Sequence, residues 1–162
     1  MKNNLKISLL ILLSFFTLQV FALDFVYTKN SFFGAGSEGN EYAIEGYDAV
    51  NYFTQNQPVE GSQDFSYEYK GKQWHFKNAQ NLALFKADPQ KYAPQYGGHC
   101  AWRVAQDGIG VYGDPKIWTI KDGKLYLNYN KAVNQRWVKD IPRFIKQGNE
   151  FWLGKNQFKS LN

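Results

Sequence analysis

The chain has 162 residues, enough for one domain of ordinary size and too few for two. Hydrophobic residues make up 44% and charged residues of both signs 20%, a composition that favours a globular fold over disorder. The formal net charge is +5, but no two Lys or Arg residues are consecutive, so nucleic-acid binding is not expected.

Residues 1–22 have the features of a secretory signal peptide. A short basic segment with Lys2 and Lys6 precedes an apolar run, and Val20-Phe21-Ala22 places small residues where a signal peptidase reads. A membrane anchor is the alternative, but a spanning helix needs about 20 apolar residues and this run is shorter. We therefore expect cleavage after Ala22 and a periplasmic or secreted mature chain with no membrane span. Loss of the two lysines lowers its net charge from +5 to +3.

The remaining chain divides into a glycine-rich lead-in (residues 23–41), one domain (42–153) and a polar tail (154–162). In the domain, residues 46–53 predict a turn leading into a short strand. Alternating aromatic residues before Gly71 predict a hairpin, and Asp122-Gly123 is a strong two-residue turn signal for a second one. We find no internal repeat in the sequence.

Helices are predicted between and after the hairpins. Residues 78–88 form one, with Asn78 as N-cap, and Pro89 stops it or starts a short turn. Residues 94–105 form a second, and a third starts at Asn130 and is kinked or divided by the later proline. The fold class is therefore α+β: a single small domain in which one antiparallel sheet of two hairpins packs with three or four helices.

Family resemblance is carried by six segments: residues 46–53, 69–71, 74–76, 85–98, 100–101 and 118–128. Together they resemble the YHS-domain family, in the larger form found in exported bacterial proteins. The resemblance covers roughly residues 42–151. It implies a small α+β domain with a suspected metal or copper connection, in a family most of whose members have no known activity. Smaller YHS domains resemble a metal module whose cysteines fall at Asn51, Lys77 and Asn81 here, so that particular site is not expected.

Cys100 is the only cysteine of the chain, and it follows His99 directly. An exported protein meets an oxidising compartment, but a single cysteine cannot form an internal disulfide. Cys100 is therefore buried and inert, paired with another molecule, or a metal ligand. Thiolate and imidazole suit copper or zinc. His75, on the first hairpin, would supply a third ligand if that hairpin packs nearby. The candidate metal site is therefore Cys100, His99 and His75.

Two other interpretations of Cys100 compete with the metal site. The first is thiol chemistry, because a helix start and a neighbouring imidazole can activate a thiol. The sequence shows neither a resolving cysteine nor an acid to orient His99, so we expect a non-enzymatic protein. On a helix, Cys100 shares a face with Tyr96 and Val104, where it would pack as a small apolar residue. The sequence thus predicts an exported, non-enzymatic module that binds or senses copper or zinc. The alternative is a small-ligand or protein-interaction domain that uses its aromatic residues and in which Cys100 is purely structural. The sequence identifies no protein partner.

Overall fold

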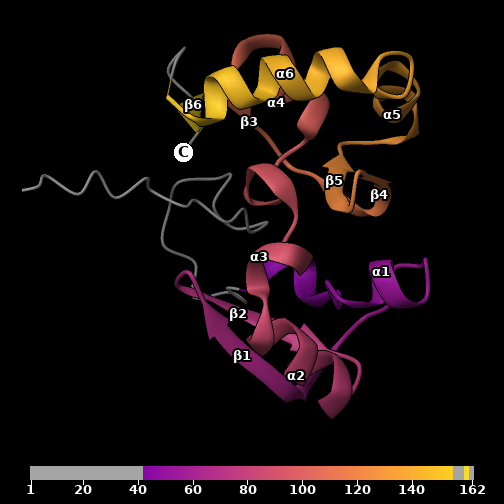
Figure 1. Ribbon diagram of the computed structural model, residues 1–162, viewed down its shortest axis with the longest axis vertical. Coiled ribbons are helices and arrows are strands. Elements are labelled where there is room, and N and C mark those ends of the chain that lie inside the picture. The colour runs from indigo at the N-terminus through magenta and orange to yellow at the C-terminus, as the bar shows by residue number, and fades with distance from the viewer. Residues whose placement is uncertain (1–41, 155–158, 161–162) are drawn as a thin grey trace, which may run out of the picture.

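The computed structural model describes residues 42–154 and 159–160, so the expected signal peptide, the lead-in and most of the tail lie outside the described residues (Figure 1). The elements, with short 3-10 turns labelled η, are η2 (Ala43–Gly46), α1 (Asn51–Thr54), β1 (Ser62–Tyr69), β2 (Lys72–Phe76), α2 (Ala79–Ala87), α3 (Pro89–Tyr92), η3 (Gln95–Gly98), α4 (Ala101–Asp107), β3 (Ile109–Gly110), β4 (Asp114–Lys121), β5 (Lys124–Asn128), α5 (Lys131–Trp137), α6 (Ile141–Trp152) and β6 (Lys159–Ser160). The α+β class is confirmed. In this part of the chain no helix has the length and apolar character needed to cross a membrane.

Both hairpins are confirmed, but they form two separate sheets instead of one. β1 pairs with β2 and β4 with β5, both antiparallel, and β3 pairs in parallel with β6. The outer edge of each hairpin is met by an irregular segment: Tyr42 bridges to Gln73 of β2, and Cys100 bridges to Leu127 of β5. β2 and β5 are not hydrogen-bonded neighbours, so the hairpins do not share a sheet.

The domain consists of two consecutive units with the same fold, here called the first unit (residues 43–92) and the second unit (95–144). The bounds of η3, β4 and β5 are those of η2, β1 and β2 shifted by 52 residues, and α6 begins 52 residues after α3. Strand register repeats as well: Ser62 pairs with Phe76 and Asp114 with Asn128, and a register shift follows at the same place in each hairpin. The expectation that the chain has no internal repeat is therefore wrong.

Equivalent residues of the two units are identical at only eight positions. These pairs are Gly46 and Gly98, Ala49 and Ala101, Val59 and Val111, Gly61 and Gly113, Gly71 and Gly123, Lys72 and Lys124, Asn78 and Asn130, and Asp88 and Asp140. Most of them set backbone geometry: glycines in turns with left-handed φ, glycines where a Cβ would overlap packed atoms, and side chains that cap helices. The repeat is thus held by backbone requirements, which leave little trace in the sequence.

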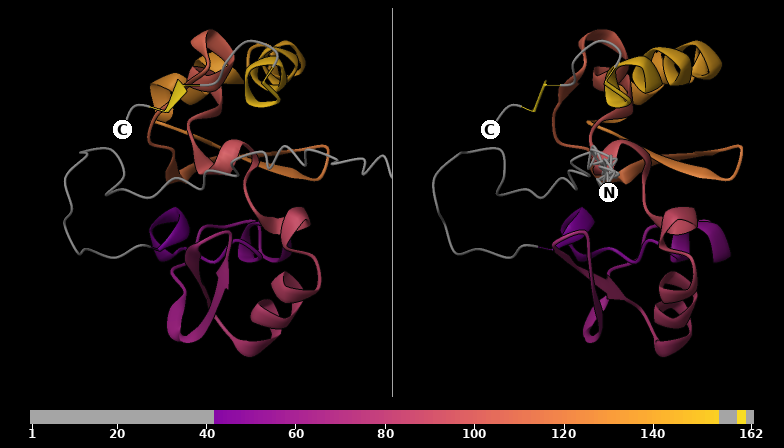
Figure 2. Two further views of the ribbon diagram at one scale, coloured as in Figure 1. Left: turned by 90° about the vertical axis from the view of Figure 1, so that its left-hand side faces the viewer. Right: turned by 60° about the vertical axis from the view of Figure 1, so that its left-hand side comes forward.

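Strand β5 forms a wall between two hydrophobic cores. Leu125 and Leu127 pack into the first core, whereas Tyr126 between them packs into the second, because successive strand side chains point to opposite faces. The equivalent residues Phe85 and Trp137 are fully buried, one in each core. Figure 1 and Figure 2 show the β4–β5 hairpin between the first unit below and helices α4 and α6 above. The single domain therefore encloses its two cores around one shared strand.

Several helix predictions are confirmed. Asn78 caps α2 by accepting the backbone N–H of Asn81 at 2.8 Å, and Pro89 starts the short helix α3. The helical region after Asn130 divides into α5 and α6 near Pro142, and Trp137 is buried as expected.

Two local predictions are wrong. Residues 46–53 hold no strand, because the carboxylate of Asp48 accepts the N–H groups of Val50 and Asn51 and so starts the helical turn α1. The helix predicted from residue 94 begins only at Ala101. Tyr96 has a left-handed φ of 56° in η3, which no right-handed helix can include.

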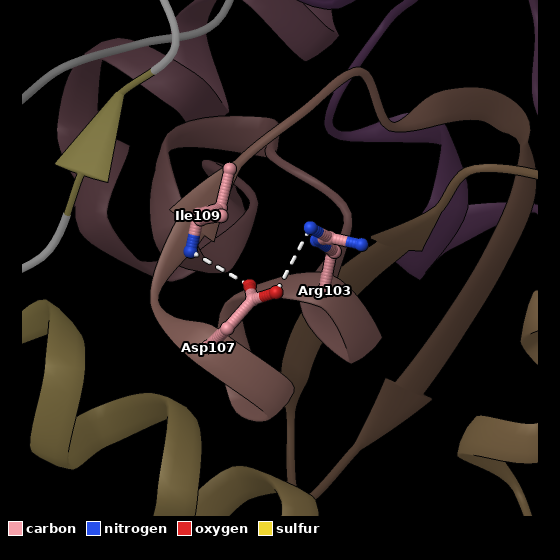
Figure 3. Close-up of polar contacts among 3 residues, drawn as sticks. All are labelled: Arg103, Asp107 and Ile109. Carbon is pink, nitrogen blue, oxygen red and sulfur yellow. Dashed lines mark hydrogen bonds and ion pairs between the residues drawn. The ribbon is translucent and has the colours of Figure 1, made fainter.

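Helix α4 ends in a tight turn that directs the chain into β3 (Figure 3). Asp107 forms an ion pair with Arg103 one helical turn earlier, with 2.9 Å between Nη2 and Oδ2, and its other oxygen accepts the N–H of Ile109 at 3.2 Å. Gly108 between them has a left-handed φ of 68°. Asp107 thereby joins the last turn of α4 to the strand that follows.

Candidate functional site

Cys100 is buried at the start of helix α4. The residue is only 1% exposed. Its Sγ accepts the backbone N–H of Tyr129, with 3.3 Å between sulfur and nitrogen, and lies 3.6 Å from Oδ1 of Asn128. Burial raises the pKa of the Cys100 thiol; backbone N–H groups, that of Arg103 foremost, lower it by less. The thiol is therefore neutral and enclosed, which opposes reactivity.

The position equivalent to Cys100 in the first unit is Asp48, a fully buried carboxylate. Its Oδ1 accepts the N–H groups of Val50 (2.8 Å) and Asn51 (3.2 Å). Its Oδ2 accepts the N–H of Lys77 (2.8 Å) and Nδ2 of Asn81 (2.6 Å). Four donors thus fix one carboxylate where η2, α1, β2 and α2 meet.

The thiol of Cys100 takes the place of this carboxylate in the second unit. Tyr129, which donates its N–H to Cys100, is the equivalent of Lys77, which donates to Asp48. Both side chains therefore join the start of a helix to the end of a hairpin. This equivalence assigns Cys100 a structural hydrogen-bonding position and supports the interpretation in which the cysteine is not a ligand.

The two histidines lie in different surroundings. His99 is 2% exposed; its Nδ1 is 3.3 Å from the carbonyl oxygen of Val111, and burial lowers its pKa to about 4. His75, on β2 of the first unit, packs against the tilted ring of Tyr42 with 4.1 Å between ring centroids, and burial also lowers its pKa. His75 therefore packs within the first unit, whereas His99 adjoins Cys100 in the second.

The residues that the structure describes form no group that fits a metal ion. Within the described ranges, no three side chains of His, Cys, Asp or Glu type lie close enough together to hold one. Asn51, Lys77 and Asn81 do come together, around a polar cavity of about 260 Å³, but amide and ammonium groups are poor ligands for a soft metal. The donor set therefore supports neither the Cys100 site nor a metal at the family's cysteine positions.

A cleft of about 520 Å³ lies between the two units, within the size range of small-molecule sites. Its lining includes four aromatic residues and two lysines, namely Tyr69, Trp74, Tyr96, Trp152, Lys70 and Lys124, of which Trp74 and Tyr96 are themselves buried. The sequence showed an abundance of aromatic residues but could not place them, because the lining comes from segments that extend from residue 69 to residue 153.

One wall of the cleft is built by the part of α6 that has no counterpart in the first unit. The equivalent helix α3 is a single turn, whereas α6 continues to Trp152. The hydroxyl of Tyr96 lies 3.2 Å from the carbonyl oxygen of Ile145 and 3.1 Å from Oδ1 of Asn149. Gly148 permits this approach, since a Cβ there would lie 2.7 Å from the Tyr96 oxygen. The extra turns of α6 are thus fastened to Tyr96 in η3, the turn that opens the second unit.

The fold and cleft define a small α+β protein of two like units with a ligand-sized cleft between them. Residues 50–96 match the family model described as the YHS domain, a range that begins in the first unit and ends in the turn that opens the second. The chain is therefore a YHS domain-containing protein. No curated protein and no solved structure matches it.

Proposed function

We propose that this protein is an exported, non-enzymatic binding module that holds a small ligand in the cleft between its two units. The observation that carries the proposal is the cleft itself, which has the volume of a ligand site and is lined by residues of both units. Interfaces between structural units are a common location for such sites. The turns of α6 that the first unit lacks close one side of it, so the cleft is not a by-product of the repeated fold.

The groups that face the cleft favour binding over catalysis. Its lining, within the described residues, contains no cysteine, histidine or carboxylate, the side chains that most often act as nucleophile or general base. Cys100 is buried away from solvent, and burial raises the pKa of its thiol.

Export to the periplasm or medium is supported by the order of the first 22 residues: basic, apolar, then Val20-Phe21-Ala22. We expect the mature chain to begin at Leu23. Mass spectrometry of the exported product measures this directly, and a product that retains Met1 would contradict cleavage.

The cleft is tested with a variant that fills it. Asn149, exposed on α6, lines the cleft, so Asn149→Trp should reduce the binding of aromatic fragments found in an NMR screen of the parent protein. Gln135→Trp adds the same ring at an exposed position of α5 outside the cleft and serves as the control. A screen without hits, or hits that bind Asn149→Trp as tightly as the parent, would refute the proposal.

The competing function is a soft-metal site at Cys100, with His99 and His75 as further ligands. It is tested by titration of the reduced protein with Cu(I) and Zn(II), beside Cys100→Ser. Because Cys100 is buried and, among the residues that the structure describes, it belongs to no group of three potential ligands, we expect parent and variant to bind equally weakly. Tight stoichiometric binding that disappears in Cys100→Ser, with a smaller loss in His99→Ala, would instead establish the metal function.

A further inference from the structure

We propose that the cleft holds the chain's own lead-in, residues 23–41, as an extended segment that a ligand has to displace. This inference goes beyond the proposed function, because it concerns what covers the cleft before a ligand enters. It follows from the direction in which the described chain begins, from the groups that line the cleft, and from the composition and charge of the lead-in.

The described chain begins beside the cleft. Tyr42 bridges to Gln73 of β2, and Trp74, the next residue of β2, belongs to the lining. Because this bridge is parallel, the chain before Tyr42 leads back along β2 toward the hairpin turn, where Lys70 also lines the cleft. An extended chain as long as residues 23–41 spans up to about 60 Å, so the lead-in is long enough to follow the cleft from end to end.

Apolar side chains of the lead-in match apolar surface that the cleft exposes. The lead-in contains Phe-Val-Tyr at residues 25–27 and Phe-Phe at residues 32–33. In the lining, Leu153 is 71% exposed and Trp152 is half-buried, both at the end of α6. Aromatic side chains carry large apolar areas, so their removal from water against this surface favours docking.

The polar groups of the lining suit a peptide backbone. Gln90, Gln95 and Asn149 each carry an amide side chain, a group that both donates and accepts hydrogen bonds. Oδ1 of Asn149 lies 3.1 Å from the Tyr96 hydroxyl, which leaves its NH₂ group for a partner. A backbone offers one N–H donor and one C=O acceptor at every residue other than proline, so an extended segment can meet both kinds of group.

The lead-in and the cleft also carry opposite charges. Residues 23–41 contain three acidic residues and one lysine, so their side chains sum to −2. Within the described residues the lining contains two lysines, Lys70 and Lys124, and no acidic residue. The ammonium group of Lys70 lies 5.4 Å from the centroid of the Tyr69 ring, which keeps its charge at this edge of the cleft. Attraction between the two charges favours docking of the segment over its release.

Photo-crosslinking of the chain that begins at Leu23 tests where the lead-in lies. The photoreactive residue p-benzoylphenylalanine replaces Phe25 in one variant and Phe32 in another, and the irradiated protein is digested with trypsin and analysed by mass spectrometry. We expect at least one of them to label the tryptic peptide of residues 147–155, which includes Asn149, Trp152 and Leu153 of the lining. Asn149→Trp, which fills the cleft, should reduce this label about threefold or more, whereas Gln135→Trp should leave it unchanged.

Fragments that bind the cleft measure the same contact by competition. A cleft that is covered in about two-thirds of the molecules is open in about one-third, so release of the lead-in should tighten fragment binding about threefold. The triple variant Phe25→Ser/Phe32→Ser/Phe33→Ser should show this gain for fragments from the NMR screen. The matched variant Phe25→Leu/Phe32→Leu/Phe33→Leu keeps the apolar contacts and should gain less.

The outcomes separate this inference from the proposed function. If neither photoreactive variant labels residues 147–155, or if Asn149→Trp leaves the label unchanged, the inference is overturned, and fragments that Asn149→Trp weakens would still make the cleft a ligand site. A label that joins only two different chains, seen as a dimer on a denaturing gel, also overturns docking within one chain. So does equal binding of fragments to the parent and the serine variant. If the label appears as expected but no fragment binds the serine variant, the lead-in is the occupant and the proposed small-ligand function falls.

Discussion

Removal of the Asp48 carboxylate should strongly destabilise the protein. In Asp48→Ala, the N–H groups of Val50 and Lys77 and the Asn81 amide lose their acceptor inside the fold, while the Asn51 N–H keeps the carbonyl oxygen of residue 48. Each unsatisfied buried group costs about 1–3 kcal/mol, but water can enter from the neighbouring 260 Å³ cavity and satisfy part of the set. We therefore expect a loss of about 3–5 kcal/mol in the free energy of unfolding, measured by urea titration followed by tryptophan fluorescence.

Two further variants test the reasoning. Asp48→Asn keeps one acceptor oxygen but turns an NH₂ group toward two of the donors, so we expect a loss of about 2–3 kcal/mol. Asp122→Asn changes the same chemical group at a site 77% exposed and should cost less than about 0.5 kcal/mol. A loss below about 1 kcal/mol in Asp48→Ala, with an unchanged dependence on urea, would show that the carboxylate does not hold the first unit together.

Three other predictions follow from buried or close-packed residues. Burial lowers the pKa of His99 to about 4, so between pH 6.5 and 4 the unfolded chain binds a proton that the folded chain does not. The free energy of unfolding should therefore fall by up to about 3 kcal/mol as the pH drops from about 6.5 to 4. Urea midpoints measured across this range should vary less in His99→Gln. Native Cys100 should react with Ellman's reagent about a hundredfold or more slowly than in urea, and equal rates would mean that the thiol is open. Gly113→Ala would press a Cβ onto the Gly98 carbonyl and should cost about 2–4 kcal/mol, whereas Gly123→Ala, whose Cβ meets nothing, should cost about 1 kcal/mol from its left-handed φ; similar costs would contradict the packing.

The features that sequence analysis found are those determined by local chemistry. Asp122-Gly123 forces the second hairpin, and Asn78 caps a helix through its own side chain, so both were predictable from neighbouring residues. The internal repeat was not predictable, because core positions tolerate the exchange of one residue for another of suitable shape, so equivalent positions of the two units need not carry the same residue. Phe85 of the first unit corresponds to Trp137 of the second, each fully buried in its own core.

The candidate site was missed for a related reason. Cys100 and His99 attracted attention because they carry reactive groups, yet the chain places both inside the second unit, and the helix expected to begin at residue 94 starts only at Ala101. The cleft depends instead on residues such as Lys70 and Trp152, which only the tertiary structure brings together. No sequence pattern of local range can reveal a lining drawn from segments this far apart.

The difference between the two units, more than their likeness, creates the site. Lys72 and Lys124 are identical, but only the second lines the cleft, and α6 extends over η3 with turns that α3 lacks. A ligand in the cleft would touch both hairpins and α6 at once, so its binding energy would be coupled to the arrangement of the units. At a concentration one hundred times its Kd, such a ligand would stabilise the folded protein by about 2.7 kcal/mol. Thermal unfolding with fragments from the NMR screen can therefore report occupancy of the cleft independently, and a Cys100→Ser variant should respond as the parent does.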